Sequence, residues 1–180
     1  MEFMDVIRTR KSTRSYIDKD VEEEKINQMF EAARLAPSWA NKQCWNYVVV
    51  SDKEKIQKLA AGIINSWMKN TAIVIVACAD PKKSGSKNGM DYYLVDVAIS
   101  MEHLVLAATN LGLGTCWIGG FDETKVKTIL NIPEKIKVVA MTPIGYSSDE
   151  GIRNKLARKV IRADTRKALE DMVHFNKWSD

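Results

Sequence analysis

Hydrophobic residues recur along the chain with two different periods, which predicts a protein built from both helices and strands. Over 21–36 they recur every three to four positions, as in an amphipathic helix that ends at Pro37. The run 71–79 is continuous and rich in β-branched residues, which predicts a central strand buried on both faces. Further helices are expected at 2–9, 52–63, 91–111 and 122–131, and further strands at 45–51, 114–120 and 137–146.

These elements alternate without strict βαβ spacing. The pattern therefore predicts an α+β fold in which helices flank a mixed central β-sheet. The expected helix 91–111, about 30 Å long, is apolar around nearly its whole circumference. Either the monomer wraps it completely or a second subunit covers one side. It contains Asp96, Glu102 and His103, so it is expected to be a buried helix rather than a membrane span.

Length and composition indicate one domain with a substantial core. The chain has 180 residues, of which 46% are hydrophobic. We expect a single domain over 1–180, with 151–180 as a basic C-terminal extension, because 151–167 holds seven cationic residues and one acid. The polar stretch 80–89 is expected to be an exposed loop.

The cysteines and histidines give no sign of a disulfide framework or a metal site. Three cysteines without CxxC spacing are typical of small core residues in a reduced compartment, so a cytoplasmic location is expected. Two histidines 71 residues apart do not suggest metal ligation. The N-terminus reads as part of the fold because acidic and basic residues interrupt any apolar run there.

Residues 8–16, RTRKSTRSY, suggest an anion-binding segment. Arg10, Lys11 and Arg14 stand among serine and threonine hydroxyls without an acidic neighbour. Charge-assisted hydrogen bonds from such a cluster suit a single phosphate group. A nucleic acid would need extended contacts and a recognition motif, and neither is apparent.

Two further segments are candidates for contacts with a flat or polar ligand. GLGTCWIGGFD (112–122) follows an expected helix and enters an expected strand, the reverse of a dinucleotide fingerprint. Gly119 and Gly120 could admit a planar ligand against bare backbone, or they could form a simple turn. In the loop after Pro37, the short polar residues could bind a heteroaromatic ring or serve as ordinary turn residues; they are Ser38, Asn41 and Gln43.

Taken together and in this order, these segments resemble the nitroreductase family of flavin enzymes. The resemblance is carried by RTRKSTRSY, APSWANKQCW, DVAISMEHLVLAATNLGLGTCWIGGFD, PIGY and RKALEDMVHFNKW. It extends from about Met4 to Trp178. It implies an α+β fold, an intertwined homodimer built around the long helix, and FMN held at the subunit interface.

The resemblance also implies roles for particular residues. Arg10, Ser12 and Arg14, with Lys11 nearby, would grip the ribityl phosphate and the pyrimidine side of the flavin. Gly119 and Gly120, after Ile118, would offer backbone N–H groups to the isoalloxazine. Pro37, Ser38 and Asn41 would reach the cofactor from the other subunit, and Arg166 would close on the phosphate. Trp39 and Gln43, from the same loop, are also implied at the cofactor.

The implied activity is reduction of nitroaromatic, quinone or similar small acceptors, with NADH or NADPH as hydride donor in a ping-pong cycle. The chemistry then belongs to the flavin, and no side chain is assigned as catalytic in its own right. Two alternatives stay open at this point. One is another flavin reaction on the same scaffold, such as dehalogenation, dehydrogenation or flavin breakdown. The second is a flavin carrier or phosphoanion-binding protein without catalytic activity.

Overall fold

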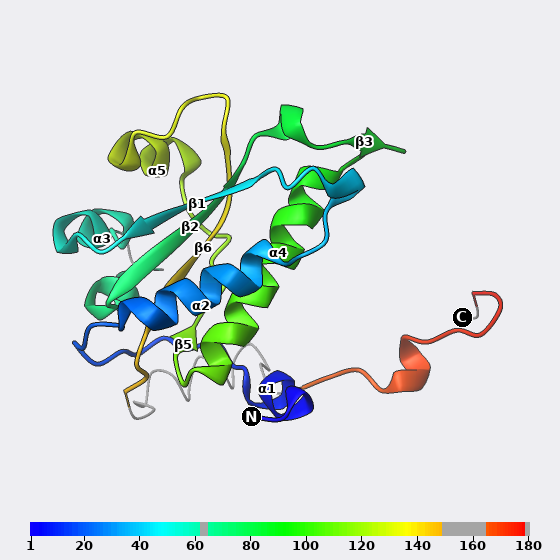
Figure 1. The fold of residues 1–180 in the computed structure, drawn as a ribbon, viewed down its shortest axis with the longest axis horizontal. Helices are drawn as coiled ribbons and strands as arrows, with labels where there is room; N and C mark the ends of the chain where they lie inside the picture. The colour runs from blue at the N-terminus through cyan, green and yellow to red at the C-terminus, as the bar shows by residue number, and fades with distance from the viewer. Residues whose placement is uncertain (62–64, 149–164, 179–180) are drawn as a thin grey trace. The chain divides into compact units, whose positions relative to one another are not determined.

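The computed structural model describes residues 1–61, 65–148 and 165–178, which divide between the units Met1–Asp149 and Glu150–Asp180. The first unit contains every α-helix and β-strand of the described residues (Figure 1). The described part of the second unit contains the short 3-10 turn η4, Leu169–Asp171. Much of the expected basic extension, 151–164 and 179–180, lies outside the described residues, so the domain organisation stays a prediction.

The sheet at the centre of the first unit has the strand order β1-β2-β6-β5. Each neighbouring pair is antiparallel, and Val76 of β2 lies opposite Val48 of β1 and Met141 of β6. Among the described residues, parallel pairing is confined to a bridge between Ser12 and Thr115, so the expected mixed sheet is mixed only there. The strand bounds are β1 Trp45–Val50, β2 Ile73–Ala79, β5 Gly114–Thr115 and β6 Lys137–Gly145.

Helices cover both faces of this sheet. The helices are α1 Phe3–Thr9, α2 Glu23–Arg34, α3 Lys53–Leu59, α4 Tyr92–Asn110 and α5 Glu123–Leu130. Helices α2 and α4 pack together on one face, while α3 and α5 lie on the opposite face (Figure 1). The sequence pattern predicted all five helices, and α3 begins after the expected cap, because the Asp52 side chain accepts hydrogen bonds from the Glu54 and Lys55 amides.

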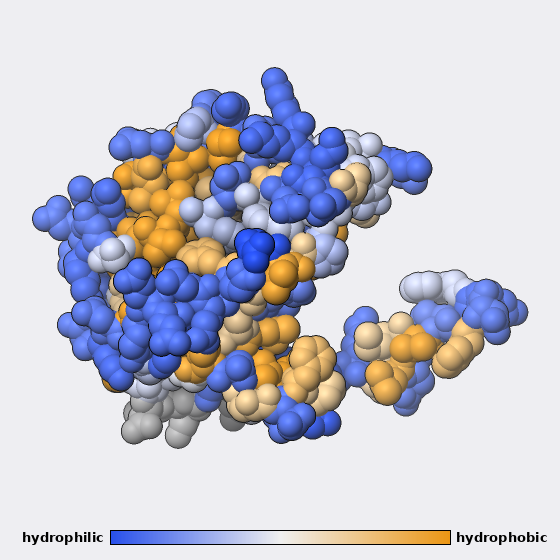
Figure 2. Space-filling model, in the orientation of Figure 1, coloured by the Kyte–Doolittle hydropathy of each residue, from blue (hydrophilic) through white to orange (hydrophobic). Residues whose placement is uncertain are grey.

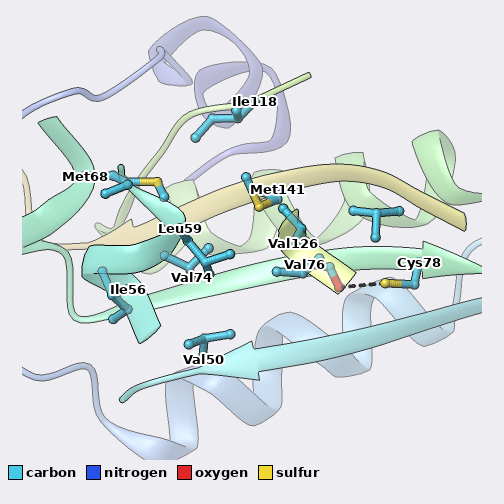
Figure 3. Packing of buried hydrophobic residues seen from close by; sticks show 12 residues of the cluster. Val50, Ile56, Leu59, Met68, Val74, Val76, Cys78, Ile118, Val126 and Met141 are labelled. Carbon is cyan, nitrogen blue, oxygen red and sulfur yellow. Dashed lines mark hydrogen bonds between the residues drawn. The ribbon is translucent and has the colours of Figure 1, made fainter. Parts of the chain in front are cut away.

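Strand β2 is buried along its whole length, as its continuous β-branched run predicted. Its side chains alternate between the two faces, as the period of a strand requires. Val74, Val76 and Cys78 join the cluster under α3 and α5, with Ile56, Val126 and Met141 (Figure 3). Ile75 joins the opposite cluster under α2 and α4.

Two expected elements differ from the structure. The strand expected over 114–120 is regular only at β5, because the Cys116 amide donates to the Thr142 hydroxyl rather than to a neighbouring backbone. The stretch 80–89, expected to be an exposed loop, begins at the buried Asp80 and is exposed at 82–83 and over 86–89. Its last part belongs to a hairpin of β3, Ser86–Lys87, and β4, Met90–Asp91. Asn88 and Gly89 both have positive φ at its tip, which suits a two-residue hairpin turn.

One long side of α4 remains partly open in the single chain. Leu94 is 47% exposed, and the half-buried residues Val95, Ala98, Ile99 and Leu106 continue the same side. Helix α1 adds the exposed side chains of Phe3, Met4 and Ile7 nearby. No helix among the described residues is long and apolar enough to cross a membrane.

Candidate functional site

The basic segment near the N-terminus runs beside β5 at the edge of the sheet. The Thr13 amide donates to the Thr115 carbonyl at 2.7 Å, and Ser12 forms the parallel bridge with Thr115. This approach is close because β5 begins with glycine. A β-carbon added at Gly114 would lie 2.7 Å from Thr13 Cγ2, inside contact distance. Gly114 therefore lets the basic segment lie against the strand.

The side chains of Arg10, Ser12 and Arg14, here called the basic cluster, converge near the thiol of Cys116. Burial raises the pKa of that thiol, while Arg14, a hydrogen bond from Ser12 and Arg10 each act in the opposite direction. Arg10 also lies near Glu102 of α4. Burial raises the pKa of Glu102, and the positive charge of Arg10 offsets part of that rise. The structure thus brings together three residues that the sequence assigned to one anion site.

Arg14 carries a buried donor that the described residues leave unused. Its Nη1 atom is shielded from solvent and has no hydrogen-bond partner in the described part of the chain. A buried unpaired donor costs roughly 1–3 kcal/mol, and more when the group is charged. An anionic ligand at this position would remove that cost. Lys11, the third basic residue implied at the site in this segment, is exposed.

Gly119 and Gly120 form a short stretch of bare backbone after the buried Ile118. Ile118 is fixed by two backbone hydrogen bonds to Met141, at 2.8 and 3.0 Å. Both glycines are exposed, neither has a left-handed φ, and a β-carbon on either would meet no described atom within 4 Å. Neither backbone conformation nor packing in the described residues therefore explains glycine at these positions. Open space above backbone N–H groups is what a flat ligand needs.

The bare backbone lies close to the basic cluster and adjoins a cavity lined by apolar and charged residues. Gly119 is three residues from Cys116, so at most about 10 Å of chain separates them. Gly120 lines a cavity of about 370 Å³ between α3 and α5, together with Leu59, Phe121 and Val126. Figure 2 shows hydrophobic residues gathered on the surface between these two helices. One edge of the sheet thus combines cationic donors, open backbone and a partly apolar recess.

The loop between α2 and β1 holds the second group of expected site residues. Ala40, Asn41 and Gln43 have φ values of 45°, 56° and 48°, an uncommon conformation for residues with side chains. The Gln43 amide donates to Ser38 Oγ at 2.9 Å, and its side chain donates to Asn41 Oδ1 at 2.8 Å. Pro37, Asn41 and Gln43 are exposed, so this loop presents polar groups at the surface.

A buried carboxylate in α4 holds that loop, and sequence reasoning did not assign it a role. Asp96 is 1% exposed, and its Oδ1 accepts the Trp39 backbone N–H at 2.8 Å. Its Oδ2 accepts from Ser84 Oγ at 2.8 Å and from the Cys44 thiol at 3.5 Å. The available signal was an acid among the apolar residues of this helix, because buried acids need partners.

Trp39 itself is held by aromatic and backbone contacts. Its ring packs against that of Tyr92 in a tilted arrangement, with 4.1 Å between the ring centroids and 39° between the ring planes. A β-carbon added at Gly85 would overlap the indole, so the ring lies directly on that backbone. The structure therefore places Trp39 between the loop and the β3–β4 hairpin, and its expected contact with a flavin stays a prediction.

The loop and the basic cluster approach α4 from different directions. Asp96, which bonds to the loop, and Glu102, whose pKa rise is partly offset by the nearby Arg10, are six residues apart on the helix. Six residues turn an α-helix by about 240°. Within one chain the two groups of expected site residues thus lie on different sides of α4.

Arg166 lies in the second unit, where it is exposed and donates from Nη1 to the Thr165 carbonyl at 2.7 Å. Its expected role at a phosphate stays a prediction. Among the described residues, no group of three or more His, Cys, Asp or Glu side chains is arranged to hold a metal ion.

Comparison with known proteins decides the family. The profile of the nitroreductase family matches residues 7–70 and 59–146. The chain belongs to the nitroreductase family. An Archaeoglobus fulgidus relative, provisionally named NADH dehydrogenase/NAD(P)H nitroreductase, is 35% identical over 98% of this chain and 99% of its own length.

Solved structures of the nitroreductase family share this fold. A family protein from Clostridium novyi NT is 39% identical, with a TM-score of 0.79 over 83% of this chain and 87% of its own. An FMN-dependent nitroreductase from Clostridium difficile R20291 is 29% identical, with a TM-score of 0.77 over 97% and 99%. The expected α+β fold is thereby confirmed.

The residues present fit the flavin mononucleotide that the family implies. The unpaired Arg14 donor and the neighbouring Arg10 and Ser12 suit its phosphate. The open backbone at Gly119 and Gly120 suits its planar ring. The unpaired donor and the open backbone are both observed in the described residues.

Proposed function

We propose that this nitroreductase-family chain reduces nitroaromatic, quinone or similar small acceptors with electrons from NADH or NADPH. The chain is an FMN-dependent NAD(P)H oxidoreductase, as its family and its relatives among nitroreductases and FMN reductases indicate. When bound, FMN supplies the redox chemistry in a ping-pong cycle, in which donor and acceptor use one pocket in turn.

The observation that carries this proposal is the buried, unpaired Nη1 of Arg14 within the basic cluster. A dianionic phosphate satisfies such a donor and balances the charge of both arginines, and each charge-assisted hydrogen bond contributes roughly 1.5–3 kcal/mol. A single phosphate group at this cluster favours FMN over a dinucleotide.

The residues of the chain would bind and orient the flavin rather than take part in covalent chemistry. The amides of Gly119 and Gly120 would face the edge of the ring, where preorganised donors stabilise developing negative charge. Arg10 and Arg14 would add positive charge to the same region. Cys116 stays protonated, because burial raises its pKa, so it does not act as a nucleophile. Protons for the acceptor would come from water.

The proposed active species is a homodimer with shared sites. The open side of α4 is apolar except for the exposed Glu102, and a symmetric copy could cover it. Within one chain the loop with Ser38 and Asn41 and the basic cluster lie on different sides of that helix. Each complete site would then take Arg10 and Arg14 from one protomer, and Ser38 and Asn41 from its partner.

The test begins with protein purified without added flavin. Flavin absorbance, release of FMN rather than FAD on heating, and oxidation of NADH or NADPH with a quinone or nitroaromatic acceptor are expected. Release of mainly FAD would contradict the single-phosphate site. Bound FMN without turnover of either nicotinamide would instead favour a flavin carrier.

A further inference from the structure

We propose that Asp96 is a positioning residue for the bound flavin, acting through the loop that carries Ser38 and Asn41. The proposal rests on the proposed function, because it assumes that this loop contacts FMN. It adds a residue that touches neither the flavin nor the substrate. Its basis is the set of contacts that this one buried side chain makes.

The carboxylate of Asp96 is buried in α4 and is satisfied by hydrogen bonds alone. No ion pair to it occurs among the described residues, although it is only 1% exposed. Three donors converge on its two oxygens, from the Trp39 backbone, the Ser84 hydroxyl and the Cys44 thiol. A buried acid is costly without such partners, so its retention in an apolar helix needs a reason beyond packing.

The reason lies in the conformation of the loop. Ala40, Asn41 and Gln43 all occupy the left-handed region, which costs roughly 1–3 kcal/mol for each residue with a side chain and persists only where surrounding contacts enforce it. Asp96 holds this segment at both ends, through Trp39 before the left-handed residues and Cys44 after them. The internal bonds of Gln43 to Ser38 and Asn41 then fix the polar groups between those ends.

The same carboxylate ties the loop to the neighbouring segment. Ser84 donates to Oδ2 and lies just before the β3–β4 hairpin, and Gly85 lies under the Trp39 ring. The Cys44 thiol stays a donor, because burial and Asp96 raise its pKa to about 11. Loop, hairpin and helix thus meet at one side chain, whose removal should loosen the loop without opening the sheet.

The experiment compares Asp96→Leu with Asp96→Asn in FMN-loaded protein. Leucine removes every acceptor and leaves the Trp39 N–H unpaired. Asparagine keeps one acceptor oxygen for Trp39, and its amide can donate to the Ser84 hydroxyl. The readout is the rate of FMN release after dilution, followed by flavin fluorescence, with the association rate and the visible spectrum of the flavin measured beside it.

We expect Asp96→Leu to release FMN roughly tenfold faster, with association changed by less than about twofold. Asp96→Asn should restore a release rate within about threefold of the unmodified protein. The matched control is Leu104→Ala, in the same helix but in the α2–α4 core, which should lower the melting temperature and leave the release rate unchanged.

Three results would overturn the proposal. They are an unchanged release rate in Asp96→Leu, no recovery in Asp96→Asn, or an equal acceleration in Leu104→Ala. If Asp96→Leu does not fold, Ser84→Ala replaces it, and release about threefold faster is then required. Unmodified protein that binds no FMN would refute the proposed function itself, which separates that failure from a failure of this inference.

Discussion

Replacing Gly119 or Gly120 by alanine should separate folding from flavin binding. Neither glycine has a left-handed φ, and an added β-carbon would meet no described atom within 4 Å. Each substitution should therefore stabilise the FMN-free protein by about 0.4–1 kcal/mol, through the smaller conformational freedom of the unfolded chain. The same methyl group would stand between the backbone and a planar ring. We expect FMN affinity to fall at least about tenfold, or ~1.4 kcal/mol.

Two measurements check this opposition of effects. Urea unfolding of the FMN-free protein gives the change in stability, and titration with FMN gives the dissociation constant. Gly114→Ala is the control, because its β-carbon would lie 2.7 Å from Thr13 Cγ2 and should cost about 1–3 kcal/mol of stability. If both variants bind FMN as tightly as the unmodified protein, the flat ligand does not lie on this backbone. Destabilisation above about 1 kcal/mol would mean that the fold itself requires these glycines.

The other predictions address the phosphate site, the shared sites and acid stability. Arg14→Ala should weaken FMN binding roughly ten- to a hundredfold in a titration, whereas Arg8→Ala, which removes an exposed arginine outside the cluster, should change it less than about twofold. Differently tagged Arg14→Ala and Asn41→Ala chains, when coexpressed, should form a heterodimer in which one of the two sites is intact, and therefore hold about half the normal FMN. A heterodimer without bound FMN would exclude shared sites. The hydrogen bond from the Tyr146 hydroxyl lowers the pKa of Glu22 from 4.5 to about 2. The contribution of the ionised Glu22 to stability is therefore present above pH 4.5 and lost toward pH 2. Glu22→Gln should lose less stability than the unmodified protein over that range, as followed by urea midpoints, and parallel curves would contradict the assignment.

The fold was predictable where the hydrophobic pattern was long and strong. Strand β2 was recognised because burial on both faces leaves no polar positions in it, and α4 because its apolar positions cover nearly the whole circumference. Helix α3 was recognised from Asp52 at its start, but its end at Leu59 was not, since the nearest glycine, Gly62, comes three residues later in the sequence. The hairpin at Asn88 and Gly89 was missed although this dipeptide favours a two-residue turn, because the flanking strands are only two residues long.

The types of residue in the candidate site were predictable from the sequence, but the tertiary contacts that position them were not. Arginines close together in sequence and two adjacent glycines stand out in a chain, and both lie on the same edge of the sheet. Asp96 could not be paired with Trp39 from sequence, because that contact joins residues 57 positions apart through the fold. The close approach of Thr13 to Gly114 is likewise a product of tertiary packing.

The three buried cysteines allow local unfolding of the first unit to be followed by thiol labelling. Cys44, Cys78 and Cys116 are free, buried and held protonated by raised pKa values, so an alkylating reagent or an electrophilic quinone meets no thiolate at the surface. Each lies in a different place: beside the Asp96 loop, under α3 and α5, and against the basic cluster. The labelling rate of each thiol therefore measures the opening free energy of one neighbourhood of the fold.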